Sequence, residues 1–337
     1  MASAMSNSFD VGIISAGKVG CALGSALRSV GHNIVGAYAS SQESKERLEV
    51  MLPDVPDMCI DDIVRRSQVV IFAVPDDILP SLIEKIANDH LFSAGQIIIH
   101  TAGRYGVNVL ESAAREGALT FALHPAMTFT GTSLDVARLA GCPFAVTASS
   151  LYRPIGEALV MEIGGHPYLV HEDNRSLYHA ALSHGANHAV TLVSSACALL
   201  KKAGISNPGA YIRPLVEVSI EGALRSGESR LTGPIVRGDV KTIGEHCAAL
   251  DALSANEILA QLEDSSQERS FSFIPADVDM DDIDNSVFFD SYDSDDMSDI
   301  AQLYRCLARI TARRALKNKK IRNEQYEDIL RHLGENG

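Results

Sequence analysis

The chain has 337 residues, enough for two domains of ordinary size, and its 46% hydrophobic and 21% charged residues are typical of a globular protein. A formal net charge of −14 argues against a nucleic-acid partner or an anionic membrane surface. The sequence shows no run of about 18 apolar residues, no secretory leader and no C-x-x-C pair among its six cysteines. We therefore expect a cytoplasmic protein with reduced thiols, without a membrane span or a metal site.

Short apolar runs in the first 170 residues predict buried strands, and helical patterns lie between the early ones. The runs are 11–14, 34–37, 69–73, 97–99 and 120–123, with later ones near 144–146 and 168–170. Strands that alternate with helices are connected by right-handed crossovers and form a mainly parallel, doubly wound sheet. We therefore predict an α/β dinucleotide-binding domain over residues 8–170.

A glycine-rich loop follows the first predicted strand. It reads Ser15-Ala16-Gly17-Lys18-Val19-Gly20, which is a G-x-G-x-x-G pattern with serine in the first position. In such a loop Gly17 allows the backbone to approach a pyrophosphate, and Gly20 allows close packing of helix on strand. The helix that follows directs its N-terminal amides at the phosphates. All six residues are predicted to bind the cofactor, the alternative being a simple turn between strand and helix.

The second predicted strand ends in Ser40 and Ser41, where an NAD-preferring site usually has an acidic residue for the ribose hydroxyls. Two hydroxyls with Lys45 or Arg47 nearby suit a 2′-phosphate, so we predict NADP rather than NAD. The alternative for the two basic residues is a solvated helix face. Glu43 is interpreted as a capping-box residue of the next helix.

Three later strand ends carry unusual residues, and ligands of open parallel sheets lie beyond such ends. They are Val74-Pro75-Asp76, His100-Thr101 and His124-Pro125. We predict that the first two groups line the nicotinamide ribose and that His124 takes part in the chemistry. The alternatives are that Asp76 caps the next helix and that the histidines are structural.

The sequence changes character after about residue 170. A long Ala- and Leu-rich pattern between Asp173 and Gly204 predicts a helix, with Asp173 as its N-cap, and further helical patterns lie at 208–226, 239–262, 299–318 and 322–333. We predict a helical substrate and dimerisation domain over 171–333, interrupted by an acidic flexible insertion at 264–298. The Asp277–Phe288 stretch fails as a calcium loop because it lacks the glycine and the final glutamate. The basic stretch 313–320 is interpreted as a solvated helix face.

The sequence resembles one bacterial family of oxidoreductases that join a Rossmann-like domain to a second domain of unknown function. The resemblance rests on the motifs G-I-I-S-A-G-K-V-G, A-V-P-D-D, H-T-A-G, L-H-P-A-M-T-F, Y-H-A-A-L-S-H-G-A-N and L-T-G-P-I-V-R-G-D. Relatives include deazaflavin-dependent NADP oxidoreductases, pyrroline-carboxylate reductases and ketopantoate reductases. The resemblance covers about 10–262 and resumes at 299–318. It implies a helical domain like that of 6-phosphogluconate dehydrogenase, a homodimer and NADP; the acidic insertion and Ser15 depart from the family pattern.

The resemblance also implies polar catalytic groups on the long helix. Asn187 would hold a substrate oxygen, and His179 would donate a proton, although the lysine that many related dehydrogenases use here is not evident. In the restricted segment before the next helix, Asp239 is interpreted as the N-cap. Thr232 and Arg237 are site candidates there, because arginine can clamp a carboxylate.

The helical half contains two further patterns that favour a site less strongly. Arg213 is a weaker candidate than Arg237, and a metal site at His184 and His188 is disfavoured because the glutamate of H-E-x-x-H is absent. Each polar candidate could instead form a helix contact.

Two classes of function fit these patterns. The first is an NADPH-dependent reductase of a small C=O or C=N compound bound between the domains, with a 2-oxo acid such as ketopantoate as one substrate and a flavin-type or deazaflavin partner as a remote option. The second is a nucleotide-binding sensor or scaffold on a dehydrogenase fold, since a fold does not fix a function.

Overall fold

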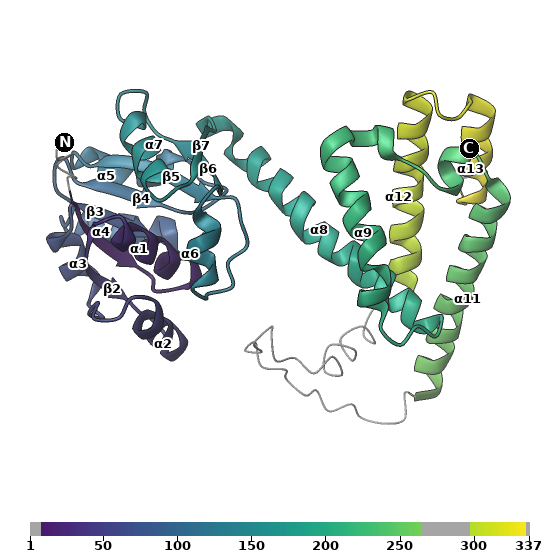
Figure 1. Cartoon of the computed structure of the whole chain (residues 1–337), viewed down its shortest axis with the longest axis horizontal. Coiled ribbons are helices and arrows are strands. Elements are labelled where there is room, and N and C mark those ends of the chain that lie inside the picture. The colour runs from purple at the N-terminus through teal and green to yellow at the C-terminus, as the bar shows by residue number, and fades with distance from the viewer. Residues whose placement is uncertain (1–7, 265–296, 335–337) are drawn as a thin grey trace, which may run out of the picture. The chain divides into compact units, whose positions relative to one another are not determined.

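The computed structural model describes residues 8–264 and 297–334. The chain forms two compact units that divide between Asn187 and His188, inside the long helix α8 (Arg175–Lys202), which belongs in part to each (Figure 1). The sequence analysis ended the first domain earlier, at residue 170, on the basis of composition alone.

The first unit is built on one seven-stranded sheet with the order β2-β1-β3-β4-β5-β6-β7. Neighbouring strands are parallel except for the antiparallel pair β5–β6. The strands are β1 (Asp10–Ile14), β2 (Asn33–Tyr38), β3 (Val69–Phe72), β4 (Ile97–His100), β5 (Leu119–Pro125), β6 (Pro143–Thr147) and β7 (His166–Leu169). Every apolar run that the sequence analysis assigned to a strand forms one, and the prediction of a mainly parallel Rossmann-type sheet is confirmed.

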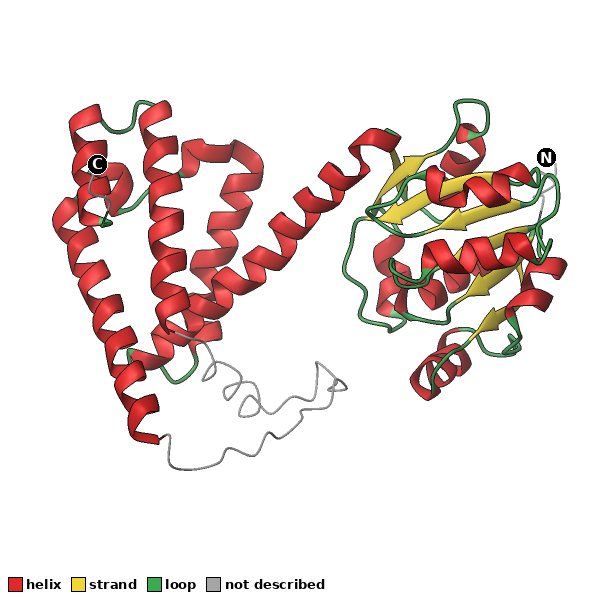
Figure 2. Cartoon of the chain, turned by 180° about the vertical axis from the view of Figure 1, so that it is seen from behind, coloured by secondary structure: helices red, strands yellow, loops and turns green. Residues whose placement is uncertain are grey.

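Helices cover both faces of this sheet, as Figure 2 shows. Successive strand residues point to opposite faces, so Ile13 packs in one core cluster and Ile14 in the other. The first cluster lies under α1 (Lys18–Ser29), α2 (Gln42–Met51), α6 (Leu134–Leu139) and α7 (Arg153–Glu162). The second lies under α3 (Ile60–Arg66), α4 (Leu79–Asn88) and α5 (Glu111–Arg115), which follows a short 3-10 turn at Val107–Leu110. Burial on both faces explains why the strands are apolar without alternation.

The second unit is helical, as predicted. Beyond the division it continues α8 and contains α9 (Pro208–Ser226), α10 (Pro234–Arg237), α11 (Val240–Asp264), α12 (Met297–Lys317) and α13 (Asn323–His332), with a 3-10 turn at Gly227–Arg230. Its largest core cluster joins α11, α12 and α13 around Ile243, Ala312 and Ile329. Asp239 caps α11 as expected, because its carboxylate accepts from the Thr242 amide at 3.1 Å.

Two local predictions around α8 had different outcomes. Asp173 is not the N-cap, because residues Glu172–Asn174 form a 3-10 turn that leads directly into Arg175. Gly204 lies just after the helix with φ +91°, a conformation that favours glycine and stops the helix there.

The acidic insertion lies, except for its ends, outside the described residues, and so does the stretch tested for calcium binding. All six cysteines lie within the described ranges and are free thiols. Within those same ranges, none of the helices combines the length and apolar character needed to cross a bilayer.

Candidate active site at the carboxyl edge of the sheet

The parallel register places the predicted site residues along one edge of the sheet. Ile14 of β1 pairs with Phe72 of β3, Phe72 pairs with His100 of β4, and His100 pairs with Ala122 of β5. The residues that follow these positions therefore emerge at the same edge. They are Ser15, Ala73 with Val74, Thr101, and His124. Ile14 also pairs with Tyr38 of β2, so Ser40, two residues after Tyr38, lies at the same edge. This edge is where open parallel sheets bind ligands.

The glycine-rich loop has the backbone that a phosphate site needs. Ala16 is buried and its amide donates to the Tyr38 carbonyl at 2.8 Å, while Gly17 is the N-cap of α1, with Lys18 and Val19 in its first turn. A β-carbon on Gly20 would lie 2.1 Å from the Ser15 carbonyl oxygen, so only glycine fits there. Ser15 itself has φ +84°, a strained value for a residue with a side chain. The serine in the first position of the pattern is therefore accommodated at some cost in backbone strain.

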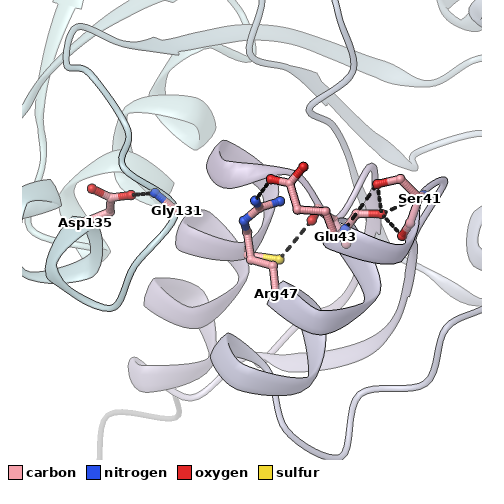
Figure 3. A network of polar contacts seen from close by, with 8 residues as sticks. Ser41, Glu43, Arg47, Gly131 and Asp135 are labelled. Atoms are coloured by element: carbon pink, nitrogen blue, oxygen red, sulfur yellow. Dashed lines mark hydrogen bonds and ion pairs between the residues drawn. The ribbon is translucent and has the colours of Figure 1, made fainter. Parts of the chain in front are cut away.

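The end of β2 and the start of α2 form the network in Figure 3. Ser41 caps α2, and its capping-box partner is Ser44, with the Ser44 amide 3.2 Å from the Ser41 hydroxyl. The interpretation of Glu43 as the capping-box residue is therefore wrong. Glu43 instead forms an ion pair with Arg47, one turn further along the helix. Ser40 is exposed next to this cap.

One carboxylate near the end of β2 was missed because it comes from the loop after α2. Asp57 accepts from the Ala39 amide at 3.1 Å through Oδ1, and its Oδ2 lies 3.4 Å from Lys45 Nζ. Both oxygens are thus engaged within the chain. A ribose hydroxyl would have to compete with Lys45 for this group.

A second missed element is the loop between β5 and α6. A β-carbon on Gly131 would lie 3.0 Å from Arg47 Nε and 3.0 Å from Lys18 Cγ, so this loop lies directly against the glycine-rich loop and α2. The fully buried Asp135 carboxylate shapes it by accepting from the Gly131 amide at 2.7 Å and the Thr130 amide at 3.1 Å (Figure 3). The sequence signal for such a loop is a Thr-Gly-Thr turn whose glycine, Gly131, lies four residues before Asp135, because an aspartate can accept hydrogen bonds from the amides of a nearby turn.

At the end of β3, Val74 and Asp76 are partly buried and Pro75 is exposed. The alternative that Asp76 caps α4 is wrong, because the N-cap position is Ile78 and no side chain bonds there. Asp76 instead lies 3.6 Å from Arg104 Nε, in the loop after β4. This pair connects the strand ends of β3 and β4.

His100 is fully buried, and both its ring nitrogens are bonded within the loop that follows β4. Nε2 donates to the Gly106 carbonyl at 2.8 Å, and Nδ1 accepts from the Ala102 amide at 3.2 Å. Glu172 fastens the same loop by accepting from the Val107 amide at 2.7 Å. The His100 ring therefore shapes the loop, and Thr101 is the half-buried residue that emerges beside β3.

This fastened loop brings Gly103 against two histidines. A β-carbon on Gly103 would lie 3.0 Å from His124 Nε2 and 2.7 Å from His179 Cδ2. The two rings are themselves 6.4 Å apart between centroids and nearly perpendicular. His124 and His179, predicted separately from β5 and from the long helix, are thus brought together at the sheet edge, half-buried.

Two residues at the start of α8 complete this cluster and were not predicted. The Tyr178 hydroxyl lies 2.8 Å from His124 Nδ1. Arg175, only 1% exposed, donates to the Thr147 hydroxyl at 2.7 Å and to the Ala122 and Ala145 carbonyls at 2.8 and 3.1 Å. Among the described residues no carboxylate forms an ion pair with Arg175, and its Nη1 has no hydrogen-bond partner. A positive charge is therefore held behind Tyr178 without a direct counter-charge.

The remaining predicted residues lie elsewhere. Asn187 is exposed on α8, eight residues after His179, which is about 12 Å along the helix axis. Thr232 and Arg237 are exposed in the second unit, before and at the end of α10. Asn187 therefore does not join the histidine cluster of the first unit.

The buried histidines predict a loss of stability in mild acid. Burial lowers the pKa of His100 to about 4 and that of His124 to about 4, with nearby Arg175 acting in the same direction. The unfolded chain then binds protons that the folded chain does not, so stability falls as pH decreases from about 6.5 towards 4. For His100 alone the loss between pH 7 and pH 5 is about 2 kcal/mol.

Urea unfolding followed by circular dichroism at pH 7 and pH 5 measures this loss. His100→Gln should reduce the pH dependence by that amount. An equal pH dependence in the wild type and in His100→Gln would contradict the assignment.

Comparisons with known proteins agree with this architecture. A model of the Rossmann-like domain matches residues 2–125, and a model of a domain of unknown function, DUF2520, matches residues 142–265. No curated protein sequence matches the chain.

Several solved structures share the fold. A "putative NADP oxidoreductase" from Bacteroides fragilis is 22% identical with a TM-score of 0.60, and the match covers 77% of this chain and 97% of that one. The pyrroline carboxylate reductase of Plasmodium falciparum, with NADP bound, is 13% identical with a TM-score of 0.50 over 93% of this chain and 97% of that one. An imine reductase from Aspergillus terreus, in complex with "NADPH4" and dibenz[c,e]azepine, is 16% identical with a TM-score of 0.50, and the match covers 76% of this chain and 87% of that one. At these identities the similarity shows a common fold.

Proposed function

We propose that this chain, which belongs to the proteins that combine a Rossmann-like domain with a DUF2520 domain, is an NADP-dependent reductase of small C=N or C=O compounds. The observation that carries the proposal is the sheet edge, where a glycine-rich loop at the N-terminus of α1 and a pair of half-buried histidines occur in one unit. The solved structures with a similar fold support it, since they include a "putative NADP oxidoreductase", a pyrroline carboxylate reductase and an imine reductase.

The residues present fit a dinucleotide. Gly17 and Gly20 leave the backbone of the loop bare, and α1 presents its N-terminus there. Val74, Pro75, Asp76 and Thr101 would flank the nicotinamide ribose at the neighbouring strand ends. A bound NADPH would supply the hydride.

The chain's own polar groups would then orient the substrate and provide a proton. His124 Nε2 is our first candidate for the proton donor, with His179 beside it. Asn187, Thr232 and Arg237 remain proposals for holding polar groups of the substrate, Arg237 for a carboxylate.

Arg47 is proposed to recognise the 2′-phosphate, together with Ser40 and Ser41. Its side chain is 13% exposed, and among the described residues its ion pair is with Glu43 of the same helix, so it can turn from Glu43 to a phosphate. Arg47→Ala should weaken NADPH binding about tenfold to 100-fold and leave NADH binding unchanged, because a charge-assisted hydrogen bond contributes about 1.5–3 kcal/mol. Fluorescence titration with both nucleotides measures this.

Arg28→Ala is the matched control for that titration, since Arg28 bonds the carbonyls of Met51 and Pro53 at the other end of α2. Equal losses for NADPH and NADH in Arg47→Ala would contradict the assignment. If the wild type prefers NADH, the result would favour Asp57, at the end of β2, as the residue that binds the ribose hydroxyls.

Turnover tests the reductase itself. NADPH oxidation is followed at 340 nm with a five-membered cyclic imine carboxylate, a simple cyclic imine and 2-oxo acids that include ketopantoate. We expect reduction of at least one C=N or C=O probe, abolished in His124→Ala. Tight NADPH binding without turnover of any probe would favour a nucleotide-binding sensor or scaffold.

Assembly and compartment are part of the proposal. Helix α9 exposes the large apolar side chains of Tyr211, Leu215, Val218 and Leu224, at 65%, 69%, 63% and 79%. Tyr211, Leu215 and Val218 follow the i, i+4, i+7 spacing of one helix face. An exposed apolar face favours a protein contact, and we propose that this one contributes to a homodimer. Six free thiols favour a reducing compartment such as the cytoplasm.

A further inference from the structure

Tyr178 contacts the proposed proton donor, yet the reaction outlined above gives it no role. Its hydroxyl lies 2.8 Å from His124 Nδ1, and the two rings meet edge to face with centroids 5.6 Å apart. Both residues belong to the first unit, one on β5 and the other on the first turn of α8. The other ring nitrogen of His124, Nε2, faces Gly103 at the sheet edge.

We propose that Tyr178 is a positioning residue that donates its hydroxyl proton to His124 Nδ1, fixes the imidazole as the Nε2–H tautomer, and restores the ring when Nε2 protonates a substrate. The inference rests on the proposed reductase function. It adds to that function a two-residue proton relay and a defined orientation for the group that meets the substrate.

The direction of this hydrogen bond follows from the partners available. If Nδ1 carried the proton, the Tyr178 hydroxyl would have to accept, and the described residues offer its own proton no acceptor. Tyr178 is half-buried, and losing a hydrogen bond from its hydroxyl costs about 0.5–1.5 kcal/mol. Burial also raises the pKa of Tyr178, so the hydroxyl keeps its proton at neutral pH.

The surroundings of His124 keep the ring neutral. Arg175 and His179 on α8 and His100 on β4 all face it, and no described carboxylate is within ion-pair distance. Burial, followed by the charges of Arg175 and His179, lowers the pKa of His124 to about 4. An imidazolium is therefore scarce at pH 7, and the ring can give up its Nε2 proton only if Nδ1 receives another.

Each proton transferred in the relay has a donor and an acceptor, and Arg175 stabilises the phenolate that forms. The Nε2–H bond breaks as a bond forms to the substrate nitrogen or oxygen, and the Tyr178 O–H bond breaks as an N–H bond forms at Nδ1. The phenolate that results lies beside the Arg175 guanidinium, whose carbon is 5.9 Å from the Tyr178 ring centroid and whose charge offsets part of the rise that burial causes in the pKa of the phenol. A proton from solvent then binds Nε2 while the Nδ1 proton returns to the Tyr178 oxygen, which regenerates both the Nε2–H tautomer and the neutral phenol.

Side-chain ¹⁵N NMR tests the hydrogen bond without requiring turnover. The His124 signal is identified as the one lost in His124→Gln. We expect the Nε2–H tautomer of a neutral ring at pH 7, and a mixture of tautomers in Tyr178→Phe. Tyr168→Phe, at an exposed tyrosine of β7, should leave the signal unchanged. An Nδ1–H tautomer in the wild type, or the same tautomer in Tyr178→Phe, would overturn the proposal.

Kinetics with a probe that the wild type reduces test the relay. Tyr178→Phe should lower kcat about tenfold to 1000-fold, the range for loss of proton-transfer assistance, with KM and the NADPH affinity nearly unchanged. An unchanged kcat in Tyr178→Phe would overturn the relay and leave the reductase function standing. If the wild type reduces no probe, the reductase function fails, and the tautomer measurement alone decides the Tyr178–His124 assignment.

Discussion

Replacing Gly17 by alanine should lower the affinity for NADPH about 100-fold while changing the free energy of unfolding by less than about 1 kcal/mol. In the protein without ligand a β-carbon at this position meets only the Ser15 hydroxyl, at 3.3 Å, and that side chain can rotate. The backbone φ of −75° suits alanine. The methyl group would instead occupy the space through which the pyrophosphate approaches α1. Calorimetric titration and urea unfolding measure the two quantities.

Two other glycines provide the comparison for Gly17→Ala. Gly209→Ala, near the start of α9 with open space around it, should change neither quantity appreciably. Gly20→Ala should disturb folding as well as binding, since its β-carbon would lie 2.1 Å from a backbone oxygen. Unchanged NADPH affinity in Gly17→Ala would mean that the phosphates do not lie at this loop.

Replacing Arg175 by methionine should destabilise the first unit by about 3 kcal/mol, because three buried acceptors lose their donor at about 1 kcal/mol each. The melting temperature should fall by about 6–12 °C. The methionine fills most of the space, so the cost reflects the lost hydrogen bonds across β5, β6 and the start of α8. Differential scanning calorimetry of the full chain measures it.

Arg115→Met is the matched control for Arg175→Met. Arg115 is 73% exposed and pairs with Glu111 along α5, so its loss should cost less than about 0.5 kcal/mol. Similar melting temperatures for Arg175→Met and the wild type would show that removing an uncompensated buried charge offsets the lost hydrogen bonds.

The fold could be predicted almost completely because local signals and burial agree. Runs such as Val69–Phe72 and Ile97–His100 are buried on both faces, which leaves a continuous apolar signal bounded by turns. Chain order and right-handed crossovers then fix the parallel order of the first five strands. The capping of α11 by Asp239 followed from its position alone, whereas the start of α8 did not, since a 3-10 turn extends the helical region across Asp173.

From the residue patterns alone, the candidate site could be predicted where a residue lies directly at a strand end. His124 and the glycine-rich loop were found in this way, whereas His179 on α8 was predicted from the family resemblance. Asp57 and the Gly131 loop were missed because they reach the end of β2 and α2 through tertiary contacts. Arg175 and Tyr178 were missed because their contacts depend on which strands lie under the first turn of α8. The spacing of residues in the sequence does not predict which strands these are.

The central claim is that the carboxyl edge of this sheet binds NADP, and titration of the wild-type chain with NADPH and with NADH tests it most directly. The account predicts one site per chain with a dissociation constant of roughly micromolar order for NADPH. It also predicts a value about tenfold or more weaker for NADH, because the 2′-phosphate contacts are lost. Absence of binding by either nucleotide would contradict the account.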